Sequence, residues 1–118
     1  NDLPSMAELL SDRIHFLHFR NVRRDSNRNF CETHLLDGDI DIAAIMRTMV
    51  REDEKREDEW QGYLGIPVRP DHGARILGDS AISHYPGYSL YGRMKSLAEI
   101  RGLEHGIRRI LLSSSSGT

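Results

Sequence analysis

Residues 66–73 of the chain read Ile-Pro-Val-Arg-Pro-Asp-His-Gly: a short apolar run followed by a guanidinium, a carboxylate and an imidazole. An apolar strand that ends in such groups is typical of a site at the carboxyl edge of a sheet. In barrels of parallel strands, that edge is where chemistry takes place. Asp71 and His72 can bind a metal or transfer protons, and Arg69 can hold an anion. We therefore expect a polar site where this strand, residues 66–69, ends.

A second strand is expected upstream, at residues 13–19, where the sequence is apolar and aromatic with two histidines. Strand alternation places His18 and Arg20 on one face and His15 on the other. His18 and Arg20 therefore share a face near the carboxyl end, and Asn21 follows at the exit. A histidine in a strand is often a hydrogen-bonded packing residue; we expect this for His15 and assign His18 to the site.

Helices are expected at residues 4–10, from Asp39 onward, and at residues 88–111. Asp39 is a reasonable N-cap for the second helix, and Asp41 adds negative charge to its first turn. The buried stripe of this helix follows i, i+3, i+4 spacing: Ile42, Ile45, Met46, Met49 and Val50. The charged run 51–59 is interpreted as a solvated helix end.

The last helix has an expected apolar face of Met94, Leu97, Leu103, Ile107, Ile110 and Leu111. Its glycines lower helix propensity and suggest close approach to a neighbour. Residues 20–38 lack a sustained period and are predicted to be a long loop. Residues 113–118 are small and polar, and we expect a disordered tail after a domain covering 1–112.

The order helix, strand, helix, strand, helix indicates an α/β fold of βα units around a parallel sheet. Two strands cannot close a barrel, which takes about 250 residues. We therefore expect that the chain is part of a larger protein or that another chain completes its sheet. The first residues carry neither an initiator Met nor the features of a signal peptide, in keeping with a chain that begins inside a longer protein.

Composition excludes several classes of protein. The formal net charge of −2 offers no basic excess for a nucleic-acid binder. No apolar run approaches the roughly 18 residues of a membrane span. The single cysteine, Cys31, cannot form an internal disulfide, and we expect a cytoplasmic protein.

Weaker candidate site residues lie in the 20–38 segment. Glu32 and His34 are spaced so that both could face one ligand, although a solvated loop explains them and Asp37 equally well. Cys31 has no CxxC or catalytic pattern and is interpreted as a bystander. Tyr88 follows Pro-Gly at a helix start, where the helix dipole favours an anion; simple packing is an equal alternative.

Four blocks of this sequence resemble the C-terminal part of the mannonate dehydratase family. They are Arg13–Asn21, His34–Asp41, Ile66–Gly73, and Pro86–Arg93 together with Leu97–Glu104. The blocks follow the family's order over most of residues 1–111. The resemblance implies the C-terminal βα units of a xylose-isomerase-like TIM (β/α)8 barrel, incomplete in this chain.

The resemblance also implies an activity: removal of water from D-mannonate to give 2-keto-3-deoxy-D-gluconate in glucuronate breakdown, with Mn²⁺ or Fe²⁺. His18 and Asp71 would be metal ligands. His72 would protonate the departing C3 hydroxyl, and Tyr88 would match the tyrosine proposed to take the C2 proton. The sugar acid would be bound by Arg20, His34 and Arg69.

The sequence departs from the family pattern at several points. The family's other metal ligands, a histidine and a cysteine, come from earlier strands, and Cys31 does not match that cysteine. Tyr85 stands where the family usually has Asn. The alternative is therefore a truncated, non-catalytic relative, or a fragment that acts only through assembly with another chain. We expect homo-oligomerisation or completion by missing N-terminal strands, and a small-molecule sugar acid as the ligand.

Overall fold

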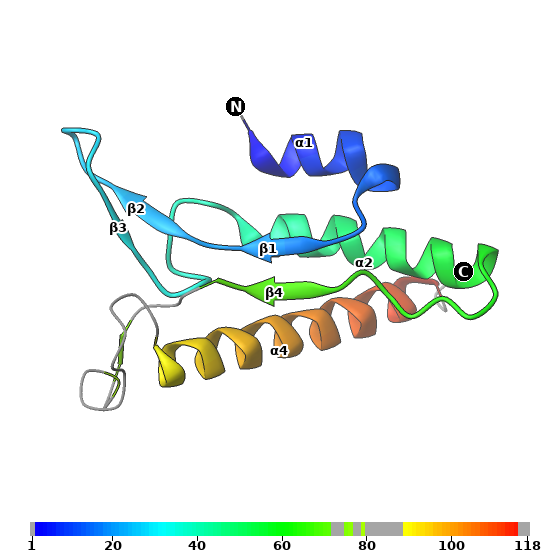
Figure 1. The fold of residues 1–118 in the computed structure, drawn as a ribbon. Helices are drawn as coiled ribbons and strands as arrows, with labels where there is room; N and C mark the ends of the chain where they lie inside the picture. The colour runs from blue at the N-terminus through cyan, green and yellow to red at the C-terminus, as the bar shows by residue number, and fades with distance from the viewer. Residues whose placement is uncertain (1, 72–74, 77–78, 80–88, 116–118) are drawn as a thin grey trace.

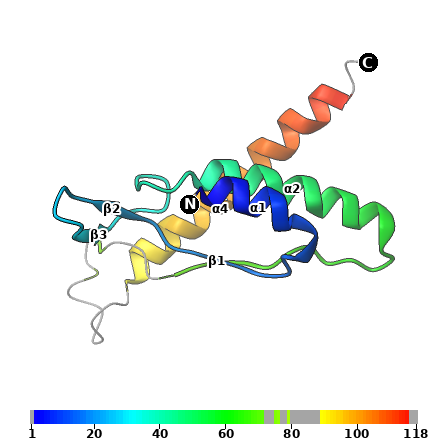
Figure 2. The same ribbon diagram turned by 90° about the horizontal axis from the view of Figure 1, so that it is seen from above.

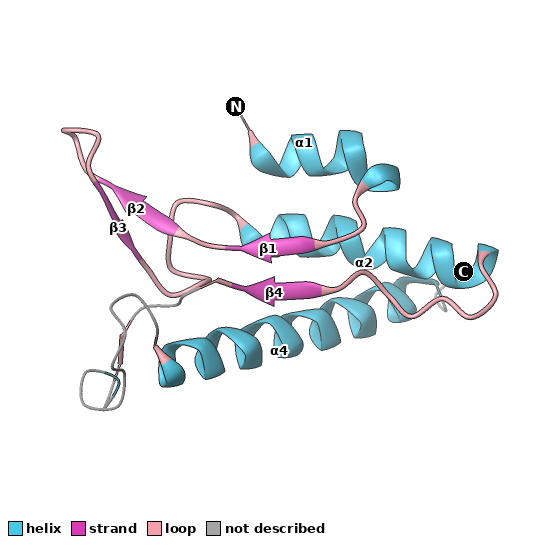
Figure 3. Ribbon diagram, viewed as in Figure 1, coloured by secondary structure: helices cyan, strands magenta, loops and turns pink. Residues whose placement is uncertain are grey.

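The computed structural model describes residues 2–71, 75–76, 79 and 89–115. Its elements are α1 (Leu3–Leu10), a short 3-10 helix η1 (Ser11–Arg13), β1 (Leu17–Phe19), β2 (Val22–Arg24), β3 (Phe30–Glu32), α2 (Ile42–Glu59), β4 (Val68–Pro70) and α4 (Leu90–Ser115) (Figures 1 and 3). None of the helices described is long and apolar enough to cross a bilayer.

The predicted parallel pair is present. β1 and β4 run in the same direction, with Leu17 opposite Val68, His18 opposite Arg69 and Phe19 opposite Pro70. Both strands are shorter than the sequence predicted, because residues 11–13 form η1 and the ladder begins only at residues 17 and 68. The described helices lie on one side of this pair (Figures 1 and 2), and none of them covers its other face.

The core lies between that pair and α2. The predicted stripe of α2 is confirmed: its five apolar residues are all buried. Phe19 from β1 and Ile66 from the entry to β4 join the same cluster, as does Ile100 of α4. Because Phe19 faces this core, its neighbour His18 must face away from it. Asp41, not Asp39, caps α2: its Oδ1 accepts a hydrogen bond from the Ala44 N–H at 2.9 Å.

The prediction of one long loop over residues 20–38 was wrong. β2 and β3 form an antiparallel hairpin that continues from β1 and projects from the body (Figure 1). Its turn is made by Asp25, whose Oδ1 accepts from the N–H groups of Asn27 and Asn29, with Arg28 in a left-handed conformation (φ 64°). Strands of only three residues are too short to show a period, so the pairing was not evident from the sequence.

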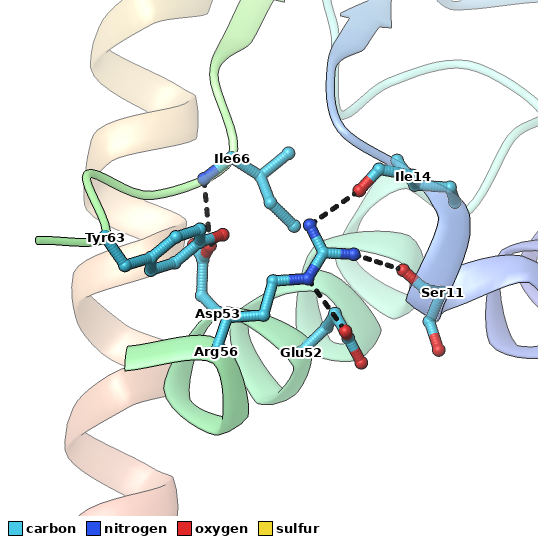
Figure 4. Close-up of polar contacts among 7 residues, drawn as sticks. All are labelled: Ser11, Ile14, Glu52, Asp53, Arg56, Tyr63 and Ile66. Carbon is cyan, nitrogen blue, oxygen red and sulfur yellow. Dashed lines mark hydrogen bonds and ion pairs between the residues drawn. The ribbon is translucent and has the colours of Figure 1, made fainter. Parts of the chain in front are cut away.

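The charged run 51–59 was predicted to be solvated, and part of it is not. Glu52, Asp53 and Arg56 are buried. The Arg56 guanidinium donates to Glu52 Oε1 at 2.8 Å and to the carbonyls of Ile14 and Ser11, each at 2.9 Å (Figure 4). The Glu52 contact is an i,i+4 pair within α2, but the bonds to Ile14 and Ser11 are non-local, so helical periodicity within α2 cannot reveal them.

Asp53 forms the second half of this cluster. Its Oδ1 accepts from the Tyr63 hydroxyl at 2.6 Å and from the Ile66 N–H at 2.9 Å (Figure 4), and its Oδ2 lies 3.3 Å from Arg108 Nη2. Burial, reinforced by the hydrogen bond to Asp53, raises the pKa of Tyr63. We call the group of Glu52, Asp53, Arg56, Tyr63 and Arg108 the amino-end cluster, because it fixes the chain where it enters β1 and β4.

The helices α1 and α4 lie where the sequence predicted them, but the residues that they bury differ in part from the prediction. On α1, Ala7 is the buried residue. On α4, Leu103, Ile107 and Leu111 pack against the core, but Met94, Leu97 and Ile110 are exposed. A Cβ placed on Gly102 or Gly106 would meet no described atom within 4 Å, so no described element packs closely against α4 at these two glycines. Residues 113–115 continue α4 rather than forming a disordered tail, and 116–118 lie outside the described residues.

Candidate functional site

Two predicted site residues meet at the carboxyl ends of β1 and β4. His18 Nε2 lies 3.2 Å from Asp71 Oδ1, and the two side chains are 43% and 18% exposed. The parallel pairing creates this contact, because the Asp71 N–H donates to the Phe19 carbonyl at 2.8 Å and extends the ladder by one residue. An imidazole and a carboxylate, 53 positions apart in sequence, thus reach the same point on the open face.

α4 supports the end of β4. Arg93 Nε donates to the Asp71 carbonyl oxygen at 3.0 Å. The Asp71 backbone is therefore held by β1 on one side and by α4 on the other. A side chain on a backbone fixed in this way is suited to hold a ligand in a defined position.

The two arginines predicted to bind an anion lie on the same face. Arg69 stands opposite His18 in the register and is exposed. Arg20 has its Nε 3.5 Å from Glu32 Oε1, and its guanidinium lies 5.8 Å from the centre of the Phe30 ring. Residues of β3 therefore hold the Arg20 side chain in place. The prediction of a loop for residues 20–38 gave no reason to expect these contacts.

His34 follows β3 and is partly buried. Its Nδ1 is buried and has no hydrogen-bond partner in the part of the chain that the structure describes. His15, predicted to be a packing residue, is instead exposed. Cys31 is exposed on the hairpin, and Asp37 is exposed as well.

His72 and Tyr88, the predicted acid and base, lie outside the described residues. Asp79, which the structure describes, interacts with the start of α4. Its buried carboxylate accepts hydrogen bonds from the N–H groups of Tyr91 at 2.7 Å and Gly92 at 3.0 Å, which caps α4. Burial alone would raise the pKa of Asp79, but these bonds and one from the Ile76 N–H outweigh it and lower the pKa.

Asn21 and Asp79 are the residues near the site whose importance sequence reasoning missed. Both are 1% exposed, and both bind backbone groups distant in sequence. A polar residue directly after a predicted strand is a weak signal for such a role. Asn21 was noted only because it follows His18 and Arg20.

The chemistry of His18 and Asp71 fits part of a divalent-cation site. Imidazole and carboxylate donors suit Mn²⁺ and Fe²⁺. Two ligands at about 2.1 Å from one octahedral ion lie about 3 Å apart, close to the observed separation of the two atoms. Within the described residues, no group of three or more His, Cys, Asp or Glu side chains converges. The described pair is therefore a partial ligand set.

Comparison with known proteins gives one consistent result. The family model for D-mannonate dehydratase (UxuA) matches residues 1–114. A mannonate dehydratase of Rhizobium meliloti (strain 1021) is 40% identical over 121 residues, which cover all of this chain and 30% of that protein. Mannonate dehydratase 1 of Agrobacterium fabrum is 44% identical over 107 residues, covering 88% of this chain and 27% of that protein.

The chain spans about 30% of the length of the first of these relatives. The match covers both strands of the parallel pair and the residues at their carboxyl ends. On this evidence the chain belongs to the mannonate dehydratase family.

Proposed function

We propose that the protein takes part in the metal-dependent dehydration of D-mannonate to 2-keto-3-deoxy-D-gluconate, in glucuronate catabolism. We further propose that its βα units are the C-terminal part of a (β/α)8 barrel. The observation that carries the proposal is the 3.2 Å approach of His18 to Asp71 at the carboxyl ends of parallel strands, in a chain of this family.

The proposed roles follow from the chemistry of the elimination. The C2–H bond and the C3–O bond break, water leaves, and the resulting enol becomes the ketone. Hydroxide is a poor leaving group, so His72 donates a proton to the C3 oxygen. Tyr88 accepts the C2 proton, which requires a phenol whose pKa is lowered by nearby positive charge.

The remaining residues bind and orient. Arg20, Arg69 and His34 hold the sugar acid on the open face of the β1–β4 pair, and His18 and Asp71 hold Mn²⁺ or Fe²⁺. When bound, the cation would offset the negative charge that develops on the substrate carboxylate. Arg93 keeps Asp71 in place through its backbone carbonyl.

Two ligands hold such a cation poorly, so the proposal requires additional donors from other strands. We propose that these come from further barrel strands or from an associated copy, and that the protein works in the cytoplasm. A non-catalytic role is the second candidate, and the partial ligand set of the described residues favours it for the chain alone.

An activity assay separates the two candidates. The 118-residue chain alone should form no 2-keto-3-deoxygluconate from D-mannonate. In a protein that joins this chain to the remaining barrel strands, His72→Ala or Tyr88→Phe should each lower kcat by at least about 10²-fold, the usual contribution of a general acid or base.

Cys31→Ser is the matched control, because Cys31 is exposed on the hairpin and should leave turnover unchanged. Full turnover in either site variant would refute the assigned roles. Absence of turnover in the joined protein with Mn²⁺ or Fe²⁺ present would favour the non-catalytic candidate.

A further inference from the structure

We propose that Asn21 is a positioning residue: its buried carboxamide fixes the segment between β3 and α2 so that His34 is held beside Arg20 at the carboxyl end of β1. The inference rests on the proposed function, because it is there that Arg20 and His34 receive their role toward the sugar acid.

The hydrogen bonds of the Asn21 side chain all join it to backbone groups of the same protein. Its Nδ2 donates to the carbonyls of Leu35 at 2.8 Å and Ile40 at 2.9 Å. Its Oδ1 accepts from the N–H groups of Val22 at 2.9 Å and Ile40 at 3.1 Å. An amide offers two donors and two acceptor lone pairs, so no capacity is left for a ligand. The side chain therefore acts by holding the 35–40 segment and not by touching substrate.

Gly38 shows how closely this segment folds over Asn21. A Cβ at position 38 would lie 2.2 Å from Asn21 Oδ1 and 2.7 Å from Thr33 Oγ1. Both distances are below any real contact of a Cβ atom, so a larger residue would displace the carboxamide. The absence of a side chain at Gly38 is thus part of the same arrangement.

The backbone pairing next to Asn21 determines where His34 lies. The Thr33 N–H donates to the Asn21 carbonyl at 3.1 Å, which extends the β2–β3 pairing by one residue beyond the ladder. Extending the same antiparallel register by one more residue, we infer that His34 lies near Arg20. The 3.5 Å contact between Arg20 and Glu32 shows that these two segments lie side by side.

His34 has the property expected of a residue held ready for a ligand. Its Nδ1 is buried without a partner among the described residues, and a buried polar atom left unsatisfied costs free energy. Because Nδ1 itself is enclosed, the accessible part of this half-buried ring is what a hydroxyl or carboxylate of a sugar acid would contact. Arg20 beside it adds the positive charge that an acid requires.

Amide hydrogen exchange and histidine ring signals on the labelled 118-residue chain test the positioning directly. In Asn21→Ala, exchange at Ile40 should accelerate on the order of tenfold or more, the equivalent of about one lost hydrogen bond. The His34 ring resonances should shift toward those of an unstructured histidine. The Asp71 amide, bonded to Phe19, should keep its protection.

Two further variants complete the hydrogen-exchange and ring-signal experiment. Gly38→Ala should also speed exchange at Ile40 and shift the His34 ring signals, although Asn21 is not substituted in this variant. Thr33→Val should change neither exchange at Ile40 nor the His34 ring signals, because the Thr33 hydroxyl is buried without a partner among the described residues. If Asn21→Ala also loses Asp71 protection through general unfolding, Gly38→Ala decides. Unchanged His34 signals in a folded Asn21 or Gly38 variant overturn the proposal.

Kinetics in an active protein containing this chain test the catalytic consequence. Asn21→Ala should raise KM for mannonate and lower kcat/KM by about 10²-fold, as expected for a displaced substrate contact. The Mn²⁺ concentration for half-maximal activity should not change, because β1 and β4 hold His18 and Asp71. Combining Asn21→Ala with His34→Ala should cost no more than either alone.

Additive losses, or an altered Mn²⁺ requirement with unchanged KM, would contradict positioning through His34. If the unmodified protein has no dehydratase activity, the proposed function fails, while the exchange and ring-signal measurements still decide whether Asn21 positions His34.

Discussion

The two ends of the β1–β4 pair carry the same kinds of side chain in opposite circumstances. At the amino end, the buried guanidinium of Arg56 has a partner for each of its three nitrogens, all of them within the chain. At the carboxyl end, His18, Arg20 and Arg69 lie on an exposed face. The comparison teaches that charged residues alone do not distinguish structural from functional positions in a sequence, whereas burial and hydrogen bonding to the backbone do.

The amino-end cluster has a structural explanation for every charge. Arg56 joins α2 to the chain that enters β1, and Asp53 joins α2 to the chain that enters β4 (Figure 4). Burial alone would lower the pKa of Arg56, but the bonds with Glu52 and Tyr63 outweigh it and raise the pKa, so Arg56 stays charged. This end therefore sets the alignment of the two strands whose other ends carry the site.

The largest expected effect comes from breaking the amino-end cluster. Arg56→Met should lower the free energy of unfolding by about 3–5 kcal/mol, because it leaves Glu52 buried without its partner. Urea unfolding of the chain measures this change. Arg51→Met, at an exposed position of the same helix, is the control and should cost little. A loss for Arg56→Met no larger than for Arg51→Met would show that the cluster does not hold the strands together.

A smaller effect is expected at the α4 cap, and it depends on pH. The pKa of Asp79 in the folded chain lies below its ordinary value of 3.8. A carboxyl with a lowered folded pKa contributes stability that is fully present above its unfolded pKa and is lost as pH falls through the folded pKa. Asp79→Asn should therefore destabilise the chain at pH 7, and the difference from wild type should shrink below pH 3.8.

Urea unfolding at a series of pH values checks this. Asp25→Asn is a useful comparison, because Asp25 also has a lowered pKa, held down mainly by its side-chain hydrogen bond from Asn29, but lies on the exposed hairpin. A difference between Asp79→Asn and wild type that is constant from pH 7 to pH 3 would contradict the role of the ionised carboxylate as the cap of α4.

Local pattern was enough to predict much of the fold. The stripe of α2 is a property of one helix, and five apolar residues at helical spacing predicted it correctly. The parallel pairing of two apolar runs separated by a helix also followed from general rules of chain connection. The β2–β3 hairpin and the buried Arg56 did not, because their energies come from partners more than a helical turn away in sequence.

The site shows the same division. Alternation in β1 correctly placed His18 on the open face, and the strand order brought it to Asp71. Asn21 and Asp79 could not be predicted, since what matters is the backbone they bind and that backbone is placed by tertiary folding. The roles of His72 and Tyr88 stay predictions.

The smallest expected effect on stability lies at the carboxyl end, where it is most informative. His18→Gln should change the free energy of unfolding by no more than about 0.5 kcal/mol, because His18 is 43% exposed and polar contacts of exposed side chains contribute little. Paramagnetic Mn²⁺ should broaden the amide signals of residues 17–20, Arg69 and Asp71 in the wild-type chain and fail to do so in the variant. His15→Gln, at an exposed position before β1, is the matched control for loss of an imidazole. If His18→Gln destabilises the chain as strongly as Arg56→Met, both ends of the strand pair are structural; if Mn²⁺ broadening persists, the cation is not held by His18.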